Sequence, residues 1–408
     1  LGALGDYGFF DALDFTRPTA GHRFALVRTH MAHHVGMSLV ALTNVLLDDV
    51  WQERFHGDTI VQSAELLLHE RVPRRLVLQG AQSARPDDAR PALEGERPVV
   101  REVGASIATE PRVALLGSPP YTVMLNHNGS GYSRFDSLAV TRWRADGTRD
   151  DLGQYCYLKD VASARVWSSG HQPVAAPADW SRTSLALDRV AMHRRDGDLE
   201  THSEITVVPA DAAEVRRVTI TNTGRESHDV ELTSYGEIVM ATPDADRSHP
   251  SFSNLFVETE WHEWCTAITA TRRPRSSDDP RLWCVHIVDA GPHRIGAVSC
   301  ETDRARFLGR GRSLRNPIAL EQDGPLSGTT GAVLDPIFAL RTRVRVAPGQ
   351  SVSVAFTTLV AESRAAAFAL ADRYHDSHAA QRALDLAWAS TQIELRELGI
   401  SPASAAAF

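Results

Sequence analysis

Cysteine and lysine are scarce in this sequence, and the few cysteines exclude one kind of metal site. The 408 residues include four cysteines, Cys156, Cys265, Cys284 and Cys300, which are widely spaced and form no CxxC pair. A zinc ribbon needs such closely spaced pairs, so this kind of metal module is excluded. Free thiols in a reducing compartment are the expected state. Lys159 is the single lysine.

Long apolar runs are also missing. The longest, residues 38–47, falls well short of the roughly 20 residues that a helix needs to cross a bilayer. It predicts a buried helix instead. The first residues show no charged region followed by an apolar one, so no secretory signal is expected.

Basic charge is in deficit, with 43 lysines and arginines against 51 acidic residues and a net charge of -8. Polyanion binders usually carry a basic field, so nucleic acid is not an expected partner. The chain also lacks a P-loop, a Rossmann glycine fingerprint and an HExxH zinc motif. We therefore expect no cofactor and no metal. The remaining balance, 43% apolar and 23% charged, is that of an ordinary globular protein.

Residues 1 to about 75 are predicted to be helical. Apolar side chains recur at three-to-four spacing from Val27 to Leu46, and a second stripe covers 60–71, with Asp58 as its cap and Pro73 as its end. Two or three helices cannot enclose a core, so they are expected to pack against further sequence. Residues 79–98 are poor in large apolar groups and rich in Pro, Asp and Arg, which is typical of an exposed, mobile linker.

From 99 to 362 the apolar period becomes two. Residues 340–346 alternate, as do 351–358 after Pro348-Gly349, which predicts an antiparallel hairpin with one face in the core. Strand patterns on both sides of 222–224 predict a second hairpin. Many such strands predict a mainly β fold, a large antiparallel β-sandwich. Helical patterns return after 362, with Ser363 as N-cap and Gly399 at the end, so helical segments flank the sandwich on both sides.

Segment 121–143 is the richest in side chains suited to sugars. Aromatic rings offer flat apolar faces to pyranose rings, while guanidinium groups reach hydroxyls. Tyr132, Arg134, Arg142 and Trp143 are therefore candidate substrate-binding residues. A hairpin with aromatic core residues explains the pattern equally well. Trp167 is a further candidate, although single tryptophans are more often core or rim residues.

Three histidines, His30, His33 and His34, fall on the first predicted helix. His30 and His34 are four residues apart and could face one metal ion, but no nearby carboxylate completes a clear ligand set. A polar wall of a sugar cleft, or satisfied core histidines, is the preferred interpretation. His33 and His34 are therefore also candidates for substrate binding. Glycoside chemistry usually needs two carboxylates flanking the bond, and no pair is marked in the first segment.

Motifs along nearly the whole chain resemble one family in the right order. YGFFDALDFT (7–16), VRTHMAHHVGMSLVAL (27–42), RFHGD (54–58) and AELLLHERVPR (64–74) resemble the end of the transglycosylating domain of cyclic β-1,2-glucan synthases, glycoside hydrolase family 189. The later motifs resemble the N-terminal part of their glycoside hydrolase family 94 domain. These are NGSGYSRF (128–135), VTRWRADGTRD (140–150), YCYLKD (155–160), VWSSGHQP (166–173), EVRRVTITN (214–222), ELTSYGEIV (231–239), HPSFSNLFVETE (249–260), FLGRGRS (307–313) and LSGTTGAVLDPI (326–337). Val35 and Lys159 depart from the family pattern, which has Gln and usually Arg there.

The resemblance implies an architecture. Residues 1–78 would be the last helices of an incomplete (α/α)6 transglycosylation barrel, 79–98 a linker, 99–362 a supersandwich of the galactose-mutarotase-like type, and 363–408 linker helices that lead to a second (α/α)6 barrel. The implied parent is anchored at the cytoplasmic face of the inner membrane, and this segment of it is soluble. The implied partners are a β-1,2-glucan, both barrels and, as in related phosphorylases, a second copy of the chain. The catalytic groups would belong to the barrels, so no catalytic residue is assigned here.

Three functions fit these observations. The first is a glucan-contacting and supporting segment of a cyclic β-1,2-glucan synthase, without a complete catalytic centre. The second is a free-standing carbohydrate-binding module, which would need an exposed aromatic platform. The third is a self-sufficient glycoside hydrolase or phosphorylase, and a hydrolase would need two carboxylates about 5–9.5 Å apart in one pocket.

Overall fold

The computed structural model of the chain describes residues 2–5, 8–16, 23–57, 61, 100–104, 111–117, 119–146, 148–274, 281–376 and 378–405. The chain divides into two compact units, Leu1–Pro86 and Asp87–Phe408. The predicted stripe at 60–71, with Asp58 and Pro73, falls outside the described residues except for residue 61. The predicted linker at 79–98 falls outside them entirely.

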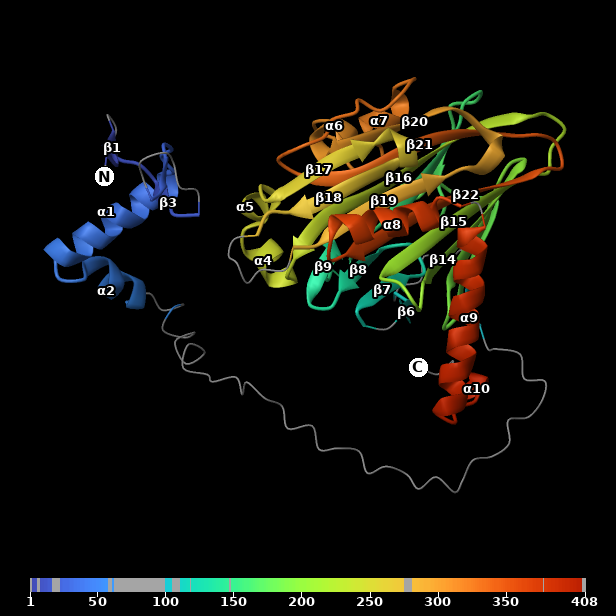
Figure 1. Ribbon diagram of the computed structural model, residues 1–408, viewed down its shortest axis with the longest axis horizontal. Helices are drawn as coiled ribbons and strands as arrows, with labels where there is room; N and C mark the ends of the chain where they lie inside the picture. Colours follow the sequence, from blue (N-terminus) through green and yellow to red (C-terminus); the bar gives the residue numbers. More distant parts are fainter. Residues whose placement is uncertain are drawn as a thin grey trace. The chain divides into compact units, whose positions relative to one another are not determined.

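The first unit combines two short hairpins with two helices (Figure 1). Strands β1 (Leu4–Gly5) and β2 (Gly8–Phe9) pair, as do β3 (Ala12–Asp14) and β4 (Ala25–Val27); α1 (Ala32–Leu46) and α2 (Val50–His56) follow. The all-helical prediction was thus wrong for the described residues up to Val27, which form two strand pairs. The helical stripe started at Val27, but extended strand pairs precede it.

The apolar side chains of α1 and α2 remain largely exposed within the described residues. Neither helix contains a buried residue. Met37, Leu42, Val45 and Leu46 are among the exposed ones, and each would gain about 1.5–3 kcal/mol from burial. The expectation that these helices need packing partners stays a prediction.

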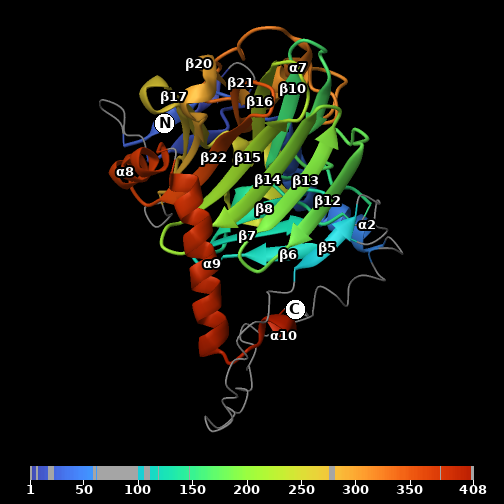
Figure 2. The same cartoon turned by 90° about the vertical axis from the view of Figure 1, so that its right-hand side faces the viewer.

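The second unit is an antiparallel β-sandwich, so the predicted fold class is confirmed (Figure 1). One sheet, here called the β15 sheet, has nine strands in the order β17 (Val257–His262), β18 (Ala267–Arg272), β19 (Trp283–Asp289), β22 (Ser351–Ala361), β15 (Ala213–Asn222), β14 (Leu199–Val207), β13 (Val190–Asp196), β12 (Trp180–Leu185) and β5 (Arg101–Gly104). Figure 2 shows β22 to β12 side by side across this sheet.

The other sheet, here called the β16 sheet, also has nine strands. Seven run in the order β11 (Val166–Ser168), β10 (Tyr155–Asp160), β16 (His228–Ala241), β9 (Leu138–Thr141), β8 (Gly131–Phe135), β7 (Tyr121–Asn126) and β6 (Val113–Leu116). The remaining two, β21 (Pro336–Val346) and β20 (Arg294–Asp303), join through β16. The main core lies between the two sheets and is built from inward-facing Val, Leu, Ile and aromatic side chains.

Both predicted hairpins were wrong in their pairing. Strands β21 and β22 exist where expected, but β21 pairs with β16 and β22 with β15. Likewise β15 and β16 lie in opposite sheets. Each pair is therefore an arch that crosses from sheet to sheet. An alternating pattern shows which face of a strand is buried, and it does not show which neighbour the strand pairs with.

Asn222 joins the two arches at the point where they meet. Its amide donates to the carbonyls of Val346 and Glu226 at 3.0 and 2.6 Å, and its side-chain oxygen accepts from the Gly224 amide at 2.9 Å. Its backbone N–H bonds the Gln350 carbonyl at 3.0 Å. This fully buried side chain satisfies turn groups that would otherwise lose their solvent partners.

Several short helices connect the strands of the sandwich. They are α4 (Pro243–Ser248), α5 (Pro250–Asn254), η2 (Glu263–Cys265), η3 (Gly291–His293), α6 (Arg304–Leu308) and α7 (Ile318–Glu321). The last helices are α8 (Arg364–Tyr374), α9 (Ala379–Glu397) and α10 (Pro402–Ala405). Ser363 caps α8 by accepting from the Ala366 amide at 3.2 Å, and Gly399 follows α9 with φ of 63°, as predicted.

Helix α9 packs on the sandwich through its first half only. Ala380, Ala383 and Leu384 are buried, whereas Trp388 and Leu398 are exposed, and Figure 2 shows the second half extending beyond the sheet. A groove of about 320 Å³ separates this part of α9 from the sandwich. None of the described helices combines the length and apolar character that a membrane span requires.

Candidate functional site: an aromatic pocket above a buried charge network

A shallow pocket forms where β8, β9 and α4 meet. Tyr132 and Arg134 lie two residues apart on β8, on the same face, and Trp143 follows β9. The Tyr132 and Trp143 rings meet edge to face, with centroids 5.4 Å apart, and the Arg134 guanidinium lies over the Tyr132 ring at 4.5 Å. The hollow measures about 20 Å³, room for a single small group.

The turn before β8 positions this pocket. The Asn126 side chain accepts from the amides of Asn128 and Ser130, at 3.1 and 3.0 Å, which holds the chain in a tight bend. Gly131 comes next, and a Cβ there would collide with the backbone oxygen of Met124. Only glycine lets β8 approach β7 this closely.

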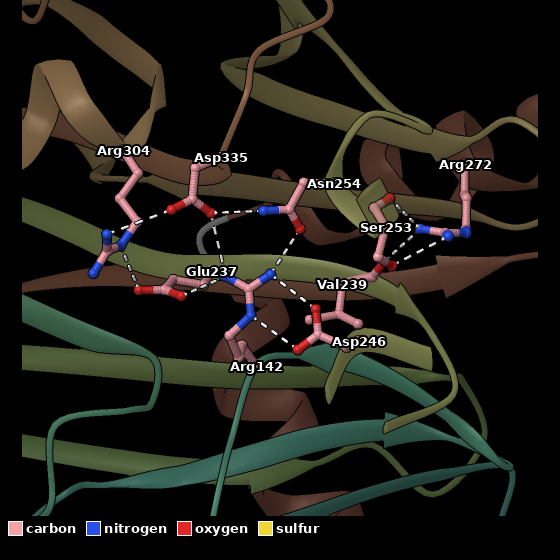
Figure 3. A network of polar contacts seen from close by, with 9 residues as sticks. All are labelled: Arg142, Glu237, Val239, Asp246, Ser253, Asn254, Arg272, Arg304 and Asp335. Atoms are coloured by element: carbon pink, nitrogen blue, oxygen red, sulfur yellow. Dashed lines mark hydrogen bonds and ion pairs between the residues drawn. The ribbon is translucent and has the colours of Figure 1, made fainter. Parts of the chain in front are cut away.

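Arg142 lies beside the pocket and is 7% exposed. All five of its N–H groups are used (Figure 3). It makes a two-pronged pair with Asp246 at 2.9 and 3.0 Å and donates to Glu237 at 2.7 Å. It also donates to Asn254 at 2.7 Å and Asp335 at 3.2 Å. A guanidinium has five donors and no acceptor, so this side chain has no capacity left for a ligand.

The network holds two guanidinium groups and three carboxylates. Arg304 completes it, donating to Glu237 at 2.7 Å and Asp335 at 3.4 Å. Burial tends to raise the pKa of Glu237, but the charges of Arg304 and Arg142 outweigh burial and lower it. Burial and the nearby Glu237 charge raise the pKa of Asp335. Three carboxylates share two guanidinium groups, and the Asp335 carboxyl therefore protonates more readily than an ordinary aspartate does.

The same network anchors the segment between β16 and β17. Asp246 belongs to α4 and Asn254 ends α5. Beside them, Arg272 of β18 donates to the Ser253 carbonyl at 2.9 Å and to the Val239 carbonyl at 3.4 Å (Figure 3). The backbone of Arg142 itself bonds the Glu237 carbonyl at 3.0 Å. These contacts fix the chain next to Trp143 on several sides.

Two predicted site residues must be corrected. Arg142 was expected to bind substrate, but it is buried and saturated by protein acceptors. Trp167 was a further candidate, for which a core or rim position was the more common interpretation; it is 1% exposed in the main core, with its indole N–H 3.3 Å from Thr201 Oγ1. A ring enclosed between two sheets cannot contact a sugar. Tyr132, Arg134 and Trp143 are brought together, each half-buried, and their role in binding stays a prediction.

His33 and His34 belong to the first unit and are exposed on α1. His34 Nδ1 lies 2.6 Å from an Asp11 carboxylate oxygen, and the two histidine rings are 4.1 Å apart. Across the described ranges, no group of three or more His, Cys, Asp or Glu side chains is arranged to hold a metal ion. The arrangement of His33 and His34 neither supports nor contradicts sugar binding, so their role stays a prediction.

Sequence reasoning missed the acidic half of the network. Glu237 lies 95 residues from Arg142, and Asp335 lies 193 residues away. Spacing cannot connect groups this distant. One signal was available: Glu237, Asn254 and Asp335 fall inside the motifs 231–239, 249–260 and 326–337.

Comparison with known proteins finds one matching family model and similar proteins whose names refer to carbohydrates. The glycosyl hydrolase 94 supersandwich domain matches residues 96–377. The whole chain is 39% identical over 412 aligned residues to the cyclic beta-(1,2)-glucan synthase NdvB of Rhizobium meliloti (strain 1021), of which it covers 14%. It is 24% identical over 59% of its length to the N,N'-diacetylchitobiose phosphorylase of Vibrio proteolyticus, of which it covers 30%.

Solved structures are more distant. A bacterial glucoamylase complexed with acarbose aligns with 74% of the chain and 39% of its own, at 8% identity and a TM-score of 0.43. The chain spans less than a third of the length of the glucan synthase and of the chitobiose phosphorylase to which it is similar.

Proposed function

The chain belongs to the glycosyl hydrolase 94 supersandwich family, and from this premise we propose that it is the glucan-contacting, supporting segment of a cyclic β-1,2-glucan synthase. In this proposal its ligand is a β-1,2-glucan and its catalytic partners are helical barrels of the same polypeptide. The similarity to a cyclic glucan synthase along the whole chain supports the choice of glucan. We propose further that the parent is anchored at the cytoplasmic face of the inner membrane, and that two copies pair.

The observation that carries the proposal is the half-buried Trp143, which lies directly after Arg142 and beside a charge network whose arginine donors are already used. Arg134 covers one face of Tyr132, so Trp143 is the ring left for a pyranose. Because the network fixes the backbone at Arg142, the indole is held in place before any ligand arrives. Preorganisation of this kind lowers the entropic cost of binding.

The same geometry disfavours a free-standing binding module. Such a module usually needs a flat, exposed aromatic platform, whereas the Tyr132 and Trp143 rings are inclined at 60° and one is covered. The pocket admits a single small group. It is better suited to receive one substituent of a glucosyl unit, in a chain that other parts of the protein also hold.

The charges support a non-catalytic role. Hydrolysis needs an acid and a nucleophile or base placed on either side of one glycosidic bond. Near the pocket, Glu237 and Asp246 are buried and bound to Arg142. A carboxylate locked in ion pairs with a lowered pKa, as for Glu237, is a poor proton donor.

Binding is tested by calorimetric titration with a linear β-1,2-linked glucotetraose. Trp143→Ala should weaken binding at least about tenfold, since loss of a stacked aromatic ring removes one of the largest contacts a small site can offer. Trp264→Ala is the matched control, because Trp264 is 64% exposed and lies on η2, outside this pocket. Equal affinities in the wild type and Trp143→Ala would overturn the assignment of the pocket.

Turnover is tested separately. The purified chain, incubated with linear β-1,2-glucan with and without phosphate, should yield neither cyclic glucan nor glucose 1-phosphate. Product formation that a carboxylate substitution within the chain abolishes would show that a catalytic centre lies inside it.

A further inference from the structure

The groove between the second half of α9 and the sandwich plays no part in the aromatic pocket. It is lined on one side by α9 and on the other by the turns that follow β6, β12 and β14, with the strand residues beside them. Its volume of about 320 Å³ lies at the lower end of the roughly 300–1,000 Å³ that small-ligand pockets enclose. The groove therefore has room for a whole sugar unit, which the aromatic pocket lacks.

One stripe of α9 lines the groove. Its residues recur three or four positions apart, which places them on the same side of the helix; they are Ala387, Ser390, Thr391, Glu394, Leu395 and Leu398. Hydroxyl and carboxylate groups thus share this stripe with apolar side chains. Ser390 Oγ donates to Glu394 Oε1 at 3.3 Å. An ionised carboxylate can accept about four hydrogen bonds, so Glu394 has acceptor capacity left for a ligand.

The continuity of α9 holds the groove open. The first half of the helix is fixed to the sandwich by the buried Ala380, Ala383 and Leu384, and the Leu384 carbonyl accepts from Arg189 Nη2 at 3.3 Å. From Ala379 to Glu397 the helix contains neither Pro nor Gly, which cause most sharp bends in helices. The second half therefore continues past the sandwich (Figure 2), and it cannot fold down onto it without breaking helical hydrogen bonds.

The charges along the groove disfavour an anion. The lining contains three carboxylates, those of Asp188, Asp211 and Glu394, and no Lys, Arg or His. Asp188 pairs with Arg189 at 2.7 Å, and Asp211 pairs with Arg373 at 2.8 Å. Glu394 has no ion-pair partner within the described ranges. An uncompensated carboxylate repels phosphate-like groups, whereas it accepts hydrogen bonds from neutral hydroxyls.

Apolar side chains form much of the rim. Leu115 and Leu398 are 70% exposed, and Leu187 is 40% exposed. Such side chains can pack against the C–H faces of a pyranose, whose hydroxyl groups remain available to Glu394. A purely apolar ligand would instead bury that carboxylate without a hydrogen-bond partner, which is costly. The groove thus suits a ligand that combines apolar faces with hydroxyl donors.

We propose that this groove binds a segment of a neutral glucan chain, with the rim leucines against the sugar and Glu394 accepting a hydrogen bond from a sugar hydroxyl. The sugar class rests on the proposed glucan function. The size of the ligand, its lack of negative charge and its hydroxyl donors follow from the groove alone. Because the rim is exposed, the remainder of the glucan can extend beyond the groove.

A methionine methyl group can report on the groove. Leu395→Met places one there, and exchanges of Leu for Met are usually well tolerated. Among the five native methionines, Met124 pairs across the strands with Tyr132 and reports on the aromatic pocket. The protein, labelled at methionine methyl groups, is titrated with linear β-1,2-linked glucotetraose and observed by NMR, with the Met124 signal assigned from Met124→Leu. The added groove signal should shift in a saturable way.

Variants of Glu394 are then made in this labelled protein. Glu394→Ala removes the acceptor, so half-saturation of the groove signal should need about three- to tenfold more sugar. Glu394→Gln keeps one acceptor oxygen and should bind the sugar more tightly than Glu394→Ala does. Glu397→Ala is the matched control: Glu397 belongs to the same helix and lies outside the groove lining, so the titration should be unchanged. If Leu395→Met itself disturbs the groove, Leu398→Met carries the reporter instead.

The outcomes separate this proposal from the proposed function. A saturable shift at Met124 without one of the groove signal would overturn the groove site and spare the proposed function. The reverse result would retain the groove site and count against the aromatic pocket, and no shift of either signal would overturn both. A groove shift that Glu394→Ala does not weaken, or that Glu394→Ala and Glu394→Gln weaken equally, would overturn the role of Glu394 as acceptor. A groove signal that moves with protein concentration in the absence of sugar would show that a second copy fills the groove, and would overturn the proposal.

Discussion

Replacing Arg142 with methionine is the most severe test of the charge network. Methionine keeps an unbranched stem and removes all five N–H donors. Glu237 and Asp246, with side chains 5% and 8% exposed, would then lie close together without the guanidinium that joins them. Removing one partner of a buried ion pair costs about 3–5 kcal/mol. Because Arg304 still contacts Glu237, we expect the lower part of this range, about 3–4 kcal/mol.

The cost converts to a measurable shift in melting temperature. The second unit, Asp87–Phe408, should unfold with an entropy of roughly 2.1 cal/mol/K per residue, so the midpoint should fall by about 4–6 °C. Urea unfolding at constant m-value gives the free energy directly. Arg345→Met is the control: Arg345 forms an exposed pair with Asp229, and its loss should leave the free energy of unfolding close to that of the wild type, because exposed ion pairs contribute little.

The pH dependence carries a second signature. In the wild type the pKa of Glu237 is lowered, so its stabilisation is complete above its unfolded pKa and is lost as pH falls. In Arg142→Met the stranded carboxyls should protonate more easily, which relieves their repulsion in acid. The stability gap between the two proteins should therefore narrow from pH 7 to pH 4. A destabilisation within 1 kcal/mol of the Arg345→Met control, or a gap that widens in acid, would refute the reasoning.

Three further predictions concern the sandwich itself. His286 is buried with its pKa lowered to about 3, mainly by desolvation. The free energy of unfolding of the wild type should therefore fall by up to roughly 1.4 kcal/mol per pH unit as the pH drops from about 6.5 to 3. The fall should be less steep in His286→Gln, and chemical unfolding across this pH range measures both slopes. Asn222→Ala should cost about 2–4 kcal/mol in urea unfolding, because buried carbonyls lose their donor; a cost below 1 kcal/mol would mean the arches do not depend on it. Gly131→Ala should cost at least about 3 kcal/mol or prevent folding, since its Cβ meets backbone, whereas Gly104→Ala meets nothing within 4 Å and should be nearly neutral in a thermal melt.

The sandwich could be predicted because its signal is local. Alternation along 340–346 and 351–358 reports burial of one face, and Pro348-Gly349 reports a turn. Neither reports the partner strand. A turn of this kind can close a hairpin or carry the chain to the opposite sheet, and packing of β15 on β22 and of β16 on β21 decides between them.

The site could be predicted only in part, for a similar reason. Tyr132 and Trp143 were both candidates within one short segment; they lie eleven residues apart by number and meet through adjacent strands. The role of Arg142 depends on carboxylates far along the chain, and no local pattern shows whether an arginine is saturated. For Trp167 a core or rim position was the more common interpretation, and its burial between the two sheets agrees with it. For Trp143 the sequence left both interpretations open, and only the packing of the strands shows that its ring is half-buried.

The most direct measurement is a crystal structure of this chain grown with linear β-1,2-linked glucotetraose. A glucosyl ring against the Trp143 indole, with Arg142 still bound to Glu237 and Asp246, is the predicted result. Sugar density elsewhere with a bare Trp143, or a sugar hydroxyl replacing a carboxylate on Arg142, would contradict it.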